Sequence, residues 1–318
     1  MDHDERRLLR ESLAQVITTA GPGGLRAAVT EFGWHDLLAE HTEAAVSTLA
    51  TLQGEHLTGM TMIDDCVLAA SGLAGPARVV YPDLPYGEPT SALDGRTLTV
   101  AGVVVAGEAE RLVIPARRGG GCAIVVVDHR LPDAEPTGLD PGSGWRRVQV
   151  RLELTDDAEV LDEEPSAAAW RAMRAAGQRW LAHELIAVGR RMLSGAVAHV
   201  TTREQFGRKI GCFQAVKHAL ADVRLWQECA ELAAEAAWED DRPEAAELAK
   251  ILAGRFVRTA AANCQQVLGG MGFTWEHEFH RYLRRALLLE PLLGTAARLR
   301  AALGARIRAE GIPRLAAL

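Results

Sequence analysis

A basic segment lies between two predicted helices, and its residue types and spacing are suited to binding an anionic ligand. Residues 202–214 include Arg203, Arg208 and Lys209, and Gly207 is predicted to end the preceding helix. Positive side chains beside the free amide groups of a helix start can bind a phosphate or a pyrophosphate. The alternative interpretation is a solvated basic turn whose glycine only stops a helix.

A glycine-rich segment further along the chain could approach a ligand closely. Gln266 is followed by glycines at positions 269, 270 and 272. Glycine permits positive φ and leaves space above the backbone, and the Gln266 amide can both donate and accept hydrogen bonds. A plain helix end is the alternative, and it explains one glycine better than three.

Three zones of different pattern must position these segments. Residues 5–72 carry apolar residues at helical spacing, which predicts a few helices. Residues 81–161 contain short runs rich in valine and isoleucine, with a tight turn at Asp94 and Gly95, which predicts a β-domain. We therefore expect an N-terminal helical domain over 1–80, a middle β-domain over 81–163 and a helical domain over 164–318.

The C-terminal zone is rich in Ala, Leu, Glu and Arg with a period near that of a helix. It predicts long helices at about 166–200, 212–240 and 243–268, with Ser166 as the first cap. Long helices with short connections favour an antiparallel bundle. The predicted fold class is α+β, mainly α.

Composition narrows the possible functions. The 318 residues carry a formal net charge of -7, which gives no electrostatic reason to expect nucleic acid as the main partner. The polar first residues and the lack of a run of about 20 apolar residues favour a cytoplasmic protein with no membrane span. The five cysteines are scattered without a CxxC pair, so we expect no disulfide framework and no metal site, and we expect each cysteine to be a small buried side chain.

Taken together, the two segments resemble the acyl-CoA dehydrogenase family. The family pattern RxxFGxxIxxFQ, then QxxGGxGF, then an arginine, is matched by these residues: Arg203, Phe206, Gly207, Ile210, Phe213, Gln214, Gln266, Gly269, Gly270, Gly272, Phe273 and Arg284. The resemblance implies an N-terminal helical domain, here shortened, a barrel-like middle domain and a C-terminal four-helix bundle. It also implies FAD and the α,β-dehydrogenation of an acyl-CoA substrate.

The resemblance assigns roles at a flavin shared between two subunits, where these segments reach the ADP half of FAD held mainly by the neighbour. It implies that Arg203 contacts the pyrophosphate and that Phe206 packs on the adenine side. Gln214 and Gln266 would hydrogen-bond near the adenosine. The glycines Gly269 and Gly270 would complete the cofactor-binding set.

The catalytic base of the family is missing from both of its usual positions. Leu293 stands where most members have a glutamate, and Gly177 stands where some relatives carry theirs. Leucine cannot accept a proton, so no catalytic residue is assigned. Glu184, expected on a solvated helix face, and Glu276, expected at a polar helix start, are the remaining weak candidates.

Two further departures concern the flavin ring and the substrate. Gly102 and Val104 occupy the strand positions where the family has a flavin-facing Trp and Thr. The N-terminal zone is shorter than usual in the family, which predicts an acyl pocket open on one side.

These losses fall on one half of a shared site, so the resemblance favours a heteromer in which a full-length homologue supplies the base and the flavin-ring site. The chain is similar to the short subunits of heterotetrameric actinobacterial acyl-CoA dehydrogenases that act on bulky, steroid-derived substrates. The family resemblance also suggests an electron-transfer flavoprotein as the electron acceptor. A self-sufficient homodimer with a relocated base, and a structural subunit without flavin, remain as alternatives.

Overall fold

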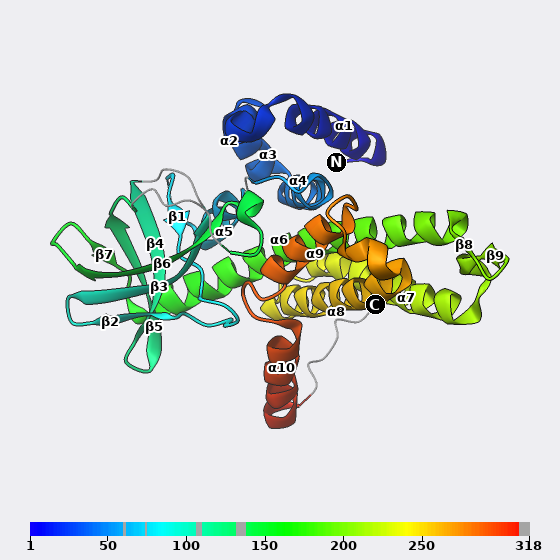
Figure 1. Ribbon diagram of the computed structural model, residues 1–318. Coiled ribbons are helices and arrows are strands. Elements are labelled where there is room, and N and C mark those ends of the chain that lie inside the picture. Colours follow the sequence, from blue (N-terminus) through cyan, green and yellow to red (C-terminus); the bar gives the residue numbers. More distant parts are fainter. Residues whose placement is uncertain (60–61, 74, 106–109, 132–137, 312–318) are drawn as a thin grey trace.

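The computed structural model describes residues 1–59, 62–73, 75–105, 110–131 and 138–311 (Figure 1). Helices predominate in this part of the chain, and a seven-stranded sheet follows the N-terminal helices and precedes the C-terminal ones. The predicted α+β, mainly helical fold class is confirmed. Within the described residues, no helix combines the length and apolar character needed to cross a bilayer.

The N-terminal helices pack on the bundle through a close helix crossing. They are α1 (His3–Thr19), α2 (Gly21–Glu31), α3 (Trp34–Glu40), α4 (Thr42–His56) and α5 (Ile63–Ser71). Gly54 of α4 faces the long helix α6 (Glu163–Thr202), where an added Cβ would lie 2.5 Å from the carbonyl oxygen of Glu184. The missing side chain therefore allows α4 to lie directly against the backbone of α6.

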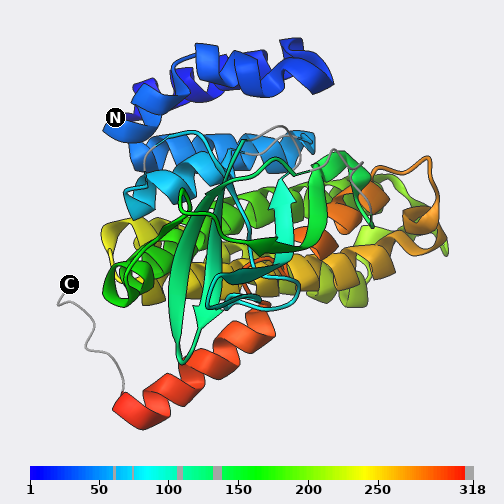
Figure 2. The same cartoon turned by 90° about the vertical axis from the view of Figure 1, so that its left-hand side faces the viewer.

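The sheet faces the viewer in Figure 2, in front of the helices. Its strands, in the order β6-β3-β2-β4-β5-β7 with β1 beside β4, are β1 (Arg78–Val79), β2 (Ser91–Asp94), β3 (Thr97–Val105), β4 (Arg111–Arg118), β5 (Gly121–Asp128), β6 (Trp145–Glu153) and β7 (Glu159–Val160). Gly95, with φ of 58°, makes the predicted turn between β2 and β3. Alternation along β3 directs Val100 and Val104 into the sheet's own core and Val103 into the core shared with the helices.

The C-terminal helices form the predicted antiparallel bundle. After α6 come the short strands β8 (Glu204–Gln205) and β9 (Arg208–Lys209), the 3-10 turn η2 (Ile210–Cys212), then α7 (Gln214–Glu239), α8 (Pro243–Leu268), the 3-10 turn η3 (Gly269–Phe273), α9 (Phe279–Leu289) and α10 (Ala296–Glu310). The ring of Phe256 on α8 fills the space beside Gly189 of α6, where an added Cβ would approach it closer than 3.0 Å. Burying such a ring contributes about 1.5–3 kcal/mol to stability.

The start of α6 differs from the prediction. The helix begins at Glu163, and Ser166 lies inside it rather than at the cap. Its hydroxyl donates to the Leu161 carbonyl at 3.0 Å and accepts from the Ile124 amide at 3.0 Å. Ser166 therefore joins the helix start to β5 of the sheet. The helix can begin before Pro165 because the first-turn amides of a helix have no partner within it.

The cysteines are less uniform than predicted. Cys66 and Cys264 are buried, Cys122 and Cys229 are half-buried, and Cys212 is exposed. Cys212 lies in η2, the single turn that leads from the hairpin into α7 at the end of the bundle.

Candidate functional site

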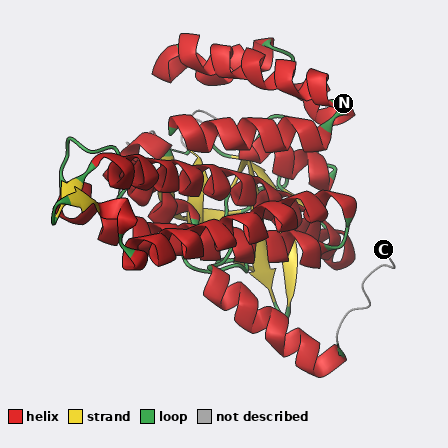
Figure 3. Cartoon of the chain, turned by 90° about the vertical axis from the view of Figure 1, so that its right-hand side faces the viewer, coloured by secondary structure: helices red, strands yellow, loops and turns green. Residues whose placement is uncertain are grey.

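The predicted basic segment forms a hairpin at one end of the bundle, which we call the hairpin end (Figure 3). Helix α6 stops at Thr202 rather than at Gly207, because Phe206 and Gly207 make the two-residue turn between β8 and β9. Both have positive φ, 55° and 73°, as such hairpin turns require. The turn leaves the Phe206 ring 90% exposed, with its centroid 6.0 Å from that of Phe213.

Arg203 is held by its backbone and free at its side chain. Its amide donates to the His199 carbonyl and its carbonyl accepts from the Ile210 amide, each at 2.9 Å. The exposed guanidinium has no partner among the described residues. Arg208, in contrast, lies 4.4 Å above the ring of Phe213. The hairpin end therefore presents Arg203 as a cation available to a ligand.

The glycine-rich segment follows directly after α8. Gly269 has φ of 58°, and a Cβ on Gly272 would lie 2.5 Å from the Gln265 side chain, so both glycines are required by the local chain. A Cβ on Gly270 would meet nothing within 4 Å. Gln266 is exposed on the last turn of α8. Gly270 and Gln266 therefore leave an open polar surface.

The antiparallel packing of α7 on α8 brings the two segments together. Asn263 Nδ2 on α8 donates to the Ala219 carbonyl on α7 at 2.9 Å. Gln266 lies one turn further along α8, and Gln214 lies at the start of α7, so both exposed amides are at the hairpin end. A cation, two amides and open backbone form a surface suited to an anionic nucleotide.

The two usual base positions meet in the structure. Leu293 Cδ1 occupies the space beside Gly177 that an added Cβ would enter, and Val67 Cγ2 lies 3.5 Å from the same point. Leu293 is only 1% exposed. Val67 of α5 and Leu293 therefore fill the space over Gly177 with side chains of this chain. The expected acyl pocket, open on one side, stays a prediction.

The turn that carries Leu293 is anchored from α8. Leu293 and Gly294 both have positive φ, 54° and 98°. Lys250 Nζ donates to the Glu290 carbonyl at 2.6 Å, and the Leu293 carbonyl lies 3.4 Å from the Cβ position of Gly87. Burial lowers the pKa of Lys250 to about 8, opposed by the charge of Glu290. The turn is thus held in place by its own chain.

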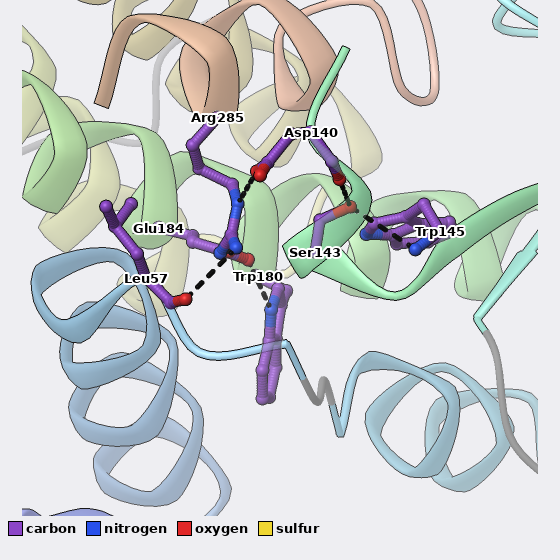
Figure 4. A network of polar contacts seen from close by, with 7 residues as sticks. All are labelled: Leu57, Asp140, Ser143, Trp145, Trp180, Glu184 and Arg285. Carbon is purple, nitrogen blue, oxygen red and sulfur yellow. Dashed lines mark hydrogen bonds and ion pairs between the residues drawn. The ribbon is translucent and has the colours of Figure 1, made fainter. Parts of the chain in front are cut away.

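Glu184 does not lie on a solvated helix face, so that expectation is wrong. The side chain is buried and accepts a hydrogen bond from Trp180 Nε1 at 3.2 Å and one from Arg285 Nη1 at 3.4 Å (Figure 4). Burial raises the pKa of Glu184, against the lowering effect of Arg285. A carboxylate enclosed in this way cannot reach a substrate.

Arg285 is the centre of a network that sequence analysis missed (Figure 4). Its Nε donates to Asp140 Oδ2 at 2.6 Å and its Nη2 to the Leu57 carbonyl at 3.3 Å, in addition to the bond with Glu184. The neighbouring Arg284, which the family pattern marks, lies 5.4 Å from the ring of exposed Trp275. The sequence does distinguish the two arginines, because Arg285 lies on the same helix face as Tyr282 and Leu289 and Arg284 does not. The buried partners of Arg285 could be seen only in the structure.

Glu276, the other weak candidate, is exposed at the rim of a surface pocket of about 470 Å³. The pocket lies between the last turns of α6 and the segment before α9, with Gly195, His199 and His277 among its lining residues. The base positions Leu293 and Gly177 do not line it. Within the described residues, no group of three His, Cys, Asp or Glu side chains could hold a metal ion.

The strand positions predicted to face the flavin ring are covered. Val104 is fully buried in the core of the sheet. A Cβ on Gly102 would collide with the carbonyl of Tyr81, whose backbone pairs with Val103. Gly102 is therefore needed for the close approach of Tyr81, and neither position presents a surface to a ring.

A sheet flanked by helices and an antiparallel bundle with a cationic, glycine-lined end define an acyl-CoA dehydrogenase type of protein. Residues 168–308 match the family described as acyl-CoA dehydrogenase, C-terminal domain. The chain is 30% identical over 314 residues to acyl-CoA dehydrogenase IpdE2 of Mycobacterium tuberculosis strain H37Rv, covering 89% of this chain and 91% of that protein. The chain therefore belongs to the acyl-CoA dehydrogenase family.

Solved structures support the same fold. The steroid acyl-CoA dehydrogenase Tcur3481-Tcur3483 (G363A variant) matches with a TM-score of 0.73 and 20% identity, covering 96% of this chain and 98% of that one. The ChsE4-ChsE5 complex of Mycobacterium tuberculosis matches with a TM-score of 0.70 and 21% identity, covering 99% of both chains. At these identities the likeness establishes the fold.

Proposed function

We propose that this chain is a subunit of a heteromeric, FAD-dependent acyl-CoA dehydrogenase. It binds the adenosine half of FAD at the hairpin end, while a full-length homologue supplies the base and the flavin-ring site. The main observation behind the proposal is the distance along α6 between Gly177, an expected base position, and Arg203 at the hairpin end. Gly177 on α6 and Arg203, the residue that directly follows the helix, are 26 residues apart, or about 39 Å along the helix axis. This is longer than an extended dinucleotide, so a flavin bound at the hairpin end would not place its ring beside Gly177 of the same chain, and Leu293 makes a full-length homologue the proposed owner of the ring site.

The hairpin end fits the nucleotide half of FAD. Arg203 would pair with the pyrophosphate, because its guanidinium has no partner among the described residues. Phe206 offers an exposed ring to the adenine. The hydrogen-bonding and backbone contacts would come from Gln214, Gln266, Gly269 and Gly270.

The ring half of FAD does not fit this chain. Leu293 fills the place of the base beside Gly177, and Tyr81 covers Gly102. When bound, FAD supplies the hydride acceptor for dehydrogenation. Without a carboxylate at position 293 this chain forgoes the roughly 10²–10⁴-fold that a positioned base contributes. A partner must therefore remove the substrate α-proton.

A bulky, steroid-derived acyl-CoA is the substrate class that we propose. Support comes from the structural similarity to a complex named as a steroid acyl-CoA dehydrogenase. The match to the two-component ChsE4-ChsE5 complex supports a heteromer. An electron-transfer flavoprotein would be the acceptor, as the resemblance to the family suggests.

The test is to purify the chain alone and co-expressed with a full-length acyl-CoA dehydrogenase homologue, and to measure flavin absorbance and dye-coupled activity. We expect a colourless, inactive chain alone and a yellow, active complex. In the complex, Arg203→Ala or Gln266→Ala should weaken FAD retention by about 1–3 kcal/mol, because each leaves a polar group of the cofactor unpaired.

Arg208→Ala is the matched control, since Arg208 stacks on Phe213 of its own chain. It should leave FAD retention nearly unchanged, and Glu276→Gln should leave turnover nearly unchanged. A yellow, active protein from this chain alone would contradict the proposal. So would an active complex that retains FAD equally well with Arg203→Ala and Gln266→Ala.

A further inference from the structure

The pocket of about 470 Å³ at the end of α6 is not used by the proposed function. It lies between the last turns of α6 and the segment before α9. Its floor is open at Gly195, because a Cβ added there would meet nothing within 4 Å. Glycine inside a helix lowers the stability of the helix, and no close contact within the described residues requires it here. The open space is therefore available to a ligand.

Basic side chains gather on the α6 side of this pocket. His199 and His277 both line it. Arg203 follows His199 by four residues, which places the two on one side of the end of α6. Burial, and repulsion by Arg203 and His277, lower the pKa of His199, so both residues lie close to its ring. Basic groups that repel one another in a cleft attract an anion.

The ring of His277 is oriented by the start of α9. Its Nδ1 accepts a hydrogen bond from the Phe279 amide at 3.1 Å. This hydrogen bond assigns the proton of the neutral ring to Nε2. His277 can therefore donate a hydrogen bond to a ligand in the pocket without carrying a positive charge.

The ring of His199 has no hydrogen-bond partner within the described part of the chain. The carbonyl groups of the last turn of α6 favour its charged form, whereas burial and the charge of Arg203 oppose it. An anion placed between His199 and Arg203 would remove this opposition. The ring is thus suited to take up a proton when an anion binds.

Other charges around the pocket are paired with each other or lie at its rim. The charged and titratable groups beside His199 are Arg191 and Arg203 from α6, Glu276, His277 and Glu278 from the segment before α9, and Tyr282 from α9. Arg191 Nη2 lies 3.7 Å from Glu278, and Arg191 Nε donates to the Tyr282 hydroxyl at 3.0 Å. Glu276 is exposed at the rim. An anion at His199 would therefore meet mainly basic groups.

We propose that His199, His277 and Arg203 together form a binding site for a phosphate group. Arg203 supplies a permanent positive charge, His277 a neutral hydrogen-bond donor, and His199 a charge that is present when its ring is protonated. Binding should therefore become tighter as the pH falls. The phosphate belongs either to the pyrophosphate of FAD or to a free phosphate compound. Only the FAD alternative rests on the proposed function.

Titration of the full chain with sulfate tests the site without FAD. Sulfate keeps the same charge between pH about 5 and about 8, so a pH effect must come from the protein. We expect NMR of the histidine rings to show that sulfate moves the titration of His199 to higher pH by about one pH unit. His35, exposed on α3, is the matched control and should not respond. In Arg203→Ala the response of His199 should be smaller. A His199 ring unaffected by sulfate, or equal responses of His199 and His35, would overturn the inference.

FAD retention by the heteromeric complex distinguishes the two sources of phosphate. If the phosphate belongs to FAD, the complex should bind FAD about tenfold more tightly at pH about 6 than at pH about 8, and His199→Gln should remove this difference. His277→Asn keeps an acceptor for the Phe279 amide and should weaken FAD binding at both pH values. His35→Gln should change neither result.

A response of His199 to sulfate combined with pH-independent FAD retention would assign the site to a free phosphate compound. A complex that binds no FAD at any pH would contradict the proposed function and leave the sulfate result standing. Circular dichroism on each variant checks that the fold is intact.

Discussion

At the scale of single residues, Leu293 and Gly177 are complementary in size, because the leucine side chain fills the space that the glycine leaves. The family has two alternative positions for its base, and this chain has a leucine at one and a glycine at the other. The structure shows that the leucine side chain uses the space that the glycine leaves open. A carboxylate introduced at position 293 would lose this contact with Gly177, so it would have a structural cost.

Leu293→Glu should lower the free energy of unfolding by about 3 kcal/mol or more, because a carboxylate would be buried against Val67 and Gly177 without a partner. Urea denaturation followed by tryptophan fluorescence measures the change. The matched control, Leu293→Met, keeps the volume and should cost less than about 1.5 kcal/mol. A Leu293→Glu chain that is stable, binds flavin and dehydrogenates an acyl-CoA on its own would show that our assignment is wrong.

At the scale of secondary structure elements, α6 is the helix on which the other parts of the molecule are arranged. It contacts the N-terminal helices at its middle, α8 along its length, and the hairpin at its end. Two of its glycines allow close packing: the Leu293 side chain lies against Gly177, and the Phe256 ring of α8 lies against Gly189. A third, Gly195, faces open space at the pocket beside His199.

Gly189→Ala should destabilise the protein by about 1–3 kcal/mol, because the new Cβ would collide with the buried Phe256 ring. Gly195→Ala, in the same helix, should instead stabilise it by about 0.5–1 kcal/mol, since its Cβ meets nothing within 4 Å and alanine has the better helix propensity. Thermal or urea unfolding distinguishes the two. Equal effects of both substitutions would contradict the close contact of α6 with α8 at Gly189.

At the scale of the whole molecule, Arg285 joins the three parts of the chain. From α9 it binds Leu57 at the end of α4, Asp140 in the segment before β6, and Glu184 on α6. One guanidinium between two carboxylates stabilises this junction only while all partners remain in place. Its loss should therefore weaken the N-terminal helices, the sheet and the bundle together.

Arg285→Met should lower the free energy of unfolding by about 3–5 kcal/mol at neutral pH, because Asp140 and Glu184 would lose their buried counterion. Burial already raises the pKa of Glu184, so its charge is removed as the pH falls, and the deficit should shrink toward acidic pH. Urea denaturation at several pH values measures this. Arg284→Met should cost only about 1 kcal/mol, since Arg284 stacks on exposed Trp275. Similar losses for both variants at all pH values would refute the junction.

The sequence by itself determined the fold class, the order of helices, strands and bundle, and the two segments at the hairpin end. These features depend on local periodicity, on turn residues such as Gly95 and Gly207, and on motif spacing, all of which are written along the chain. Ser166 and Glu184 were misjudged because their roles depend on partners far away in sequence: Ile124 for one and Arg285 for the other. Only the tertiary structure placed Leu293 against Gly177 and brought Asp140 and Glu184 to Arg285. The helical spacing of the apolar residues in α9 indicates which arginine faces inward, but the partners that it meets there depend on which elements pack together.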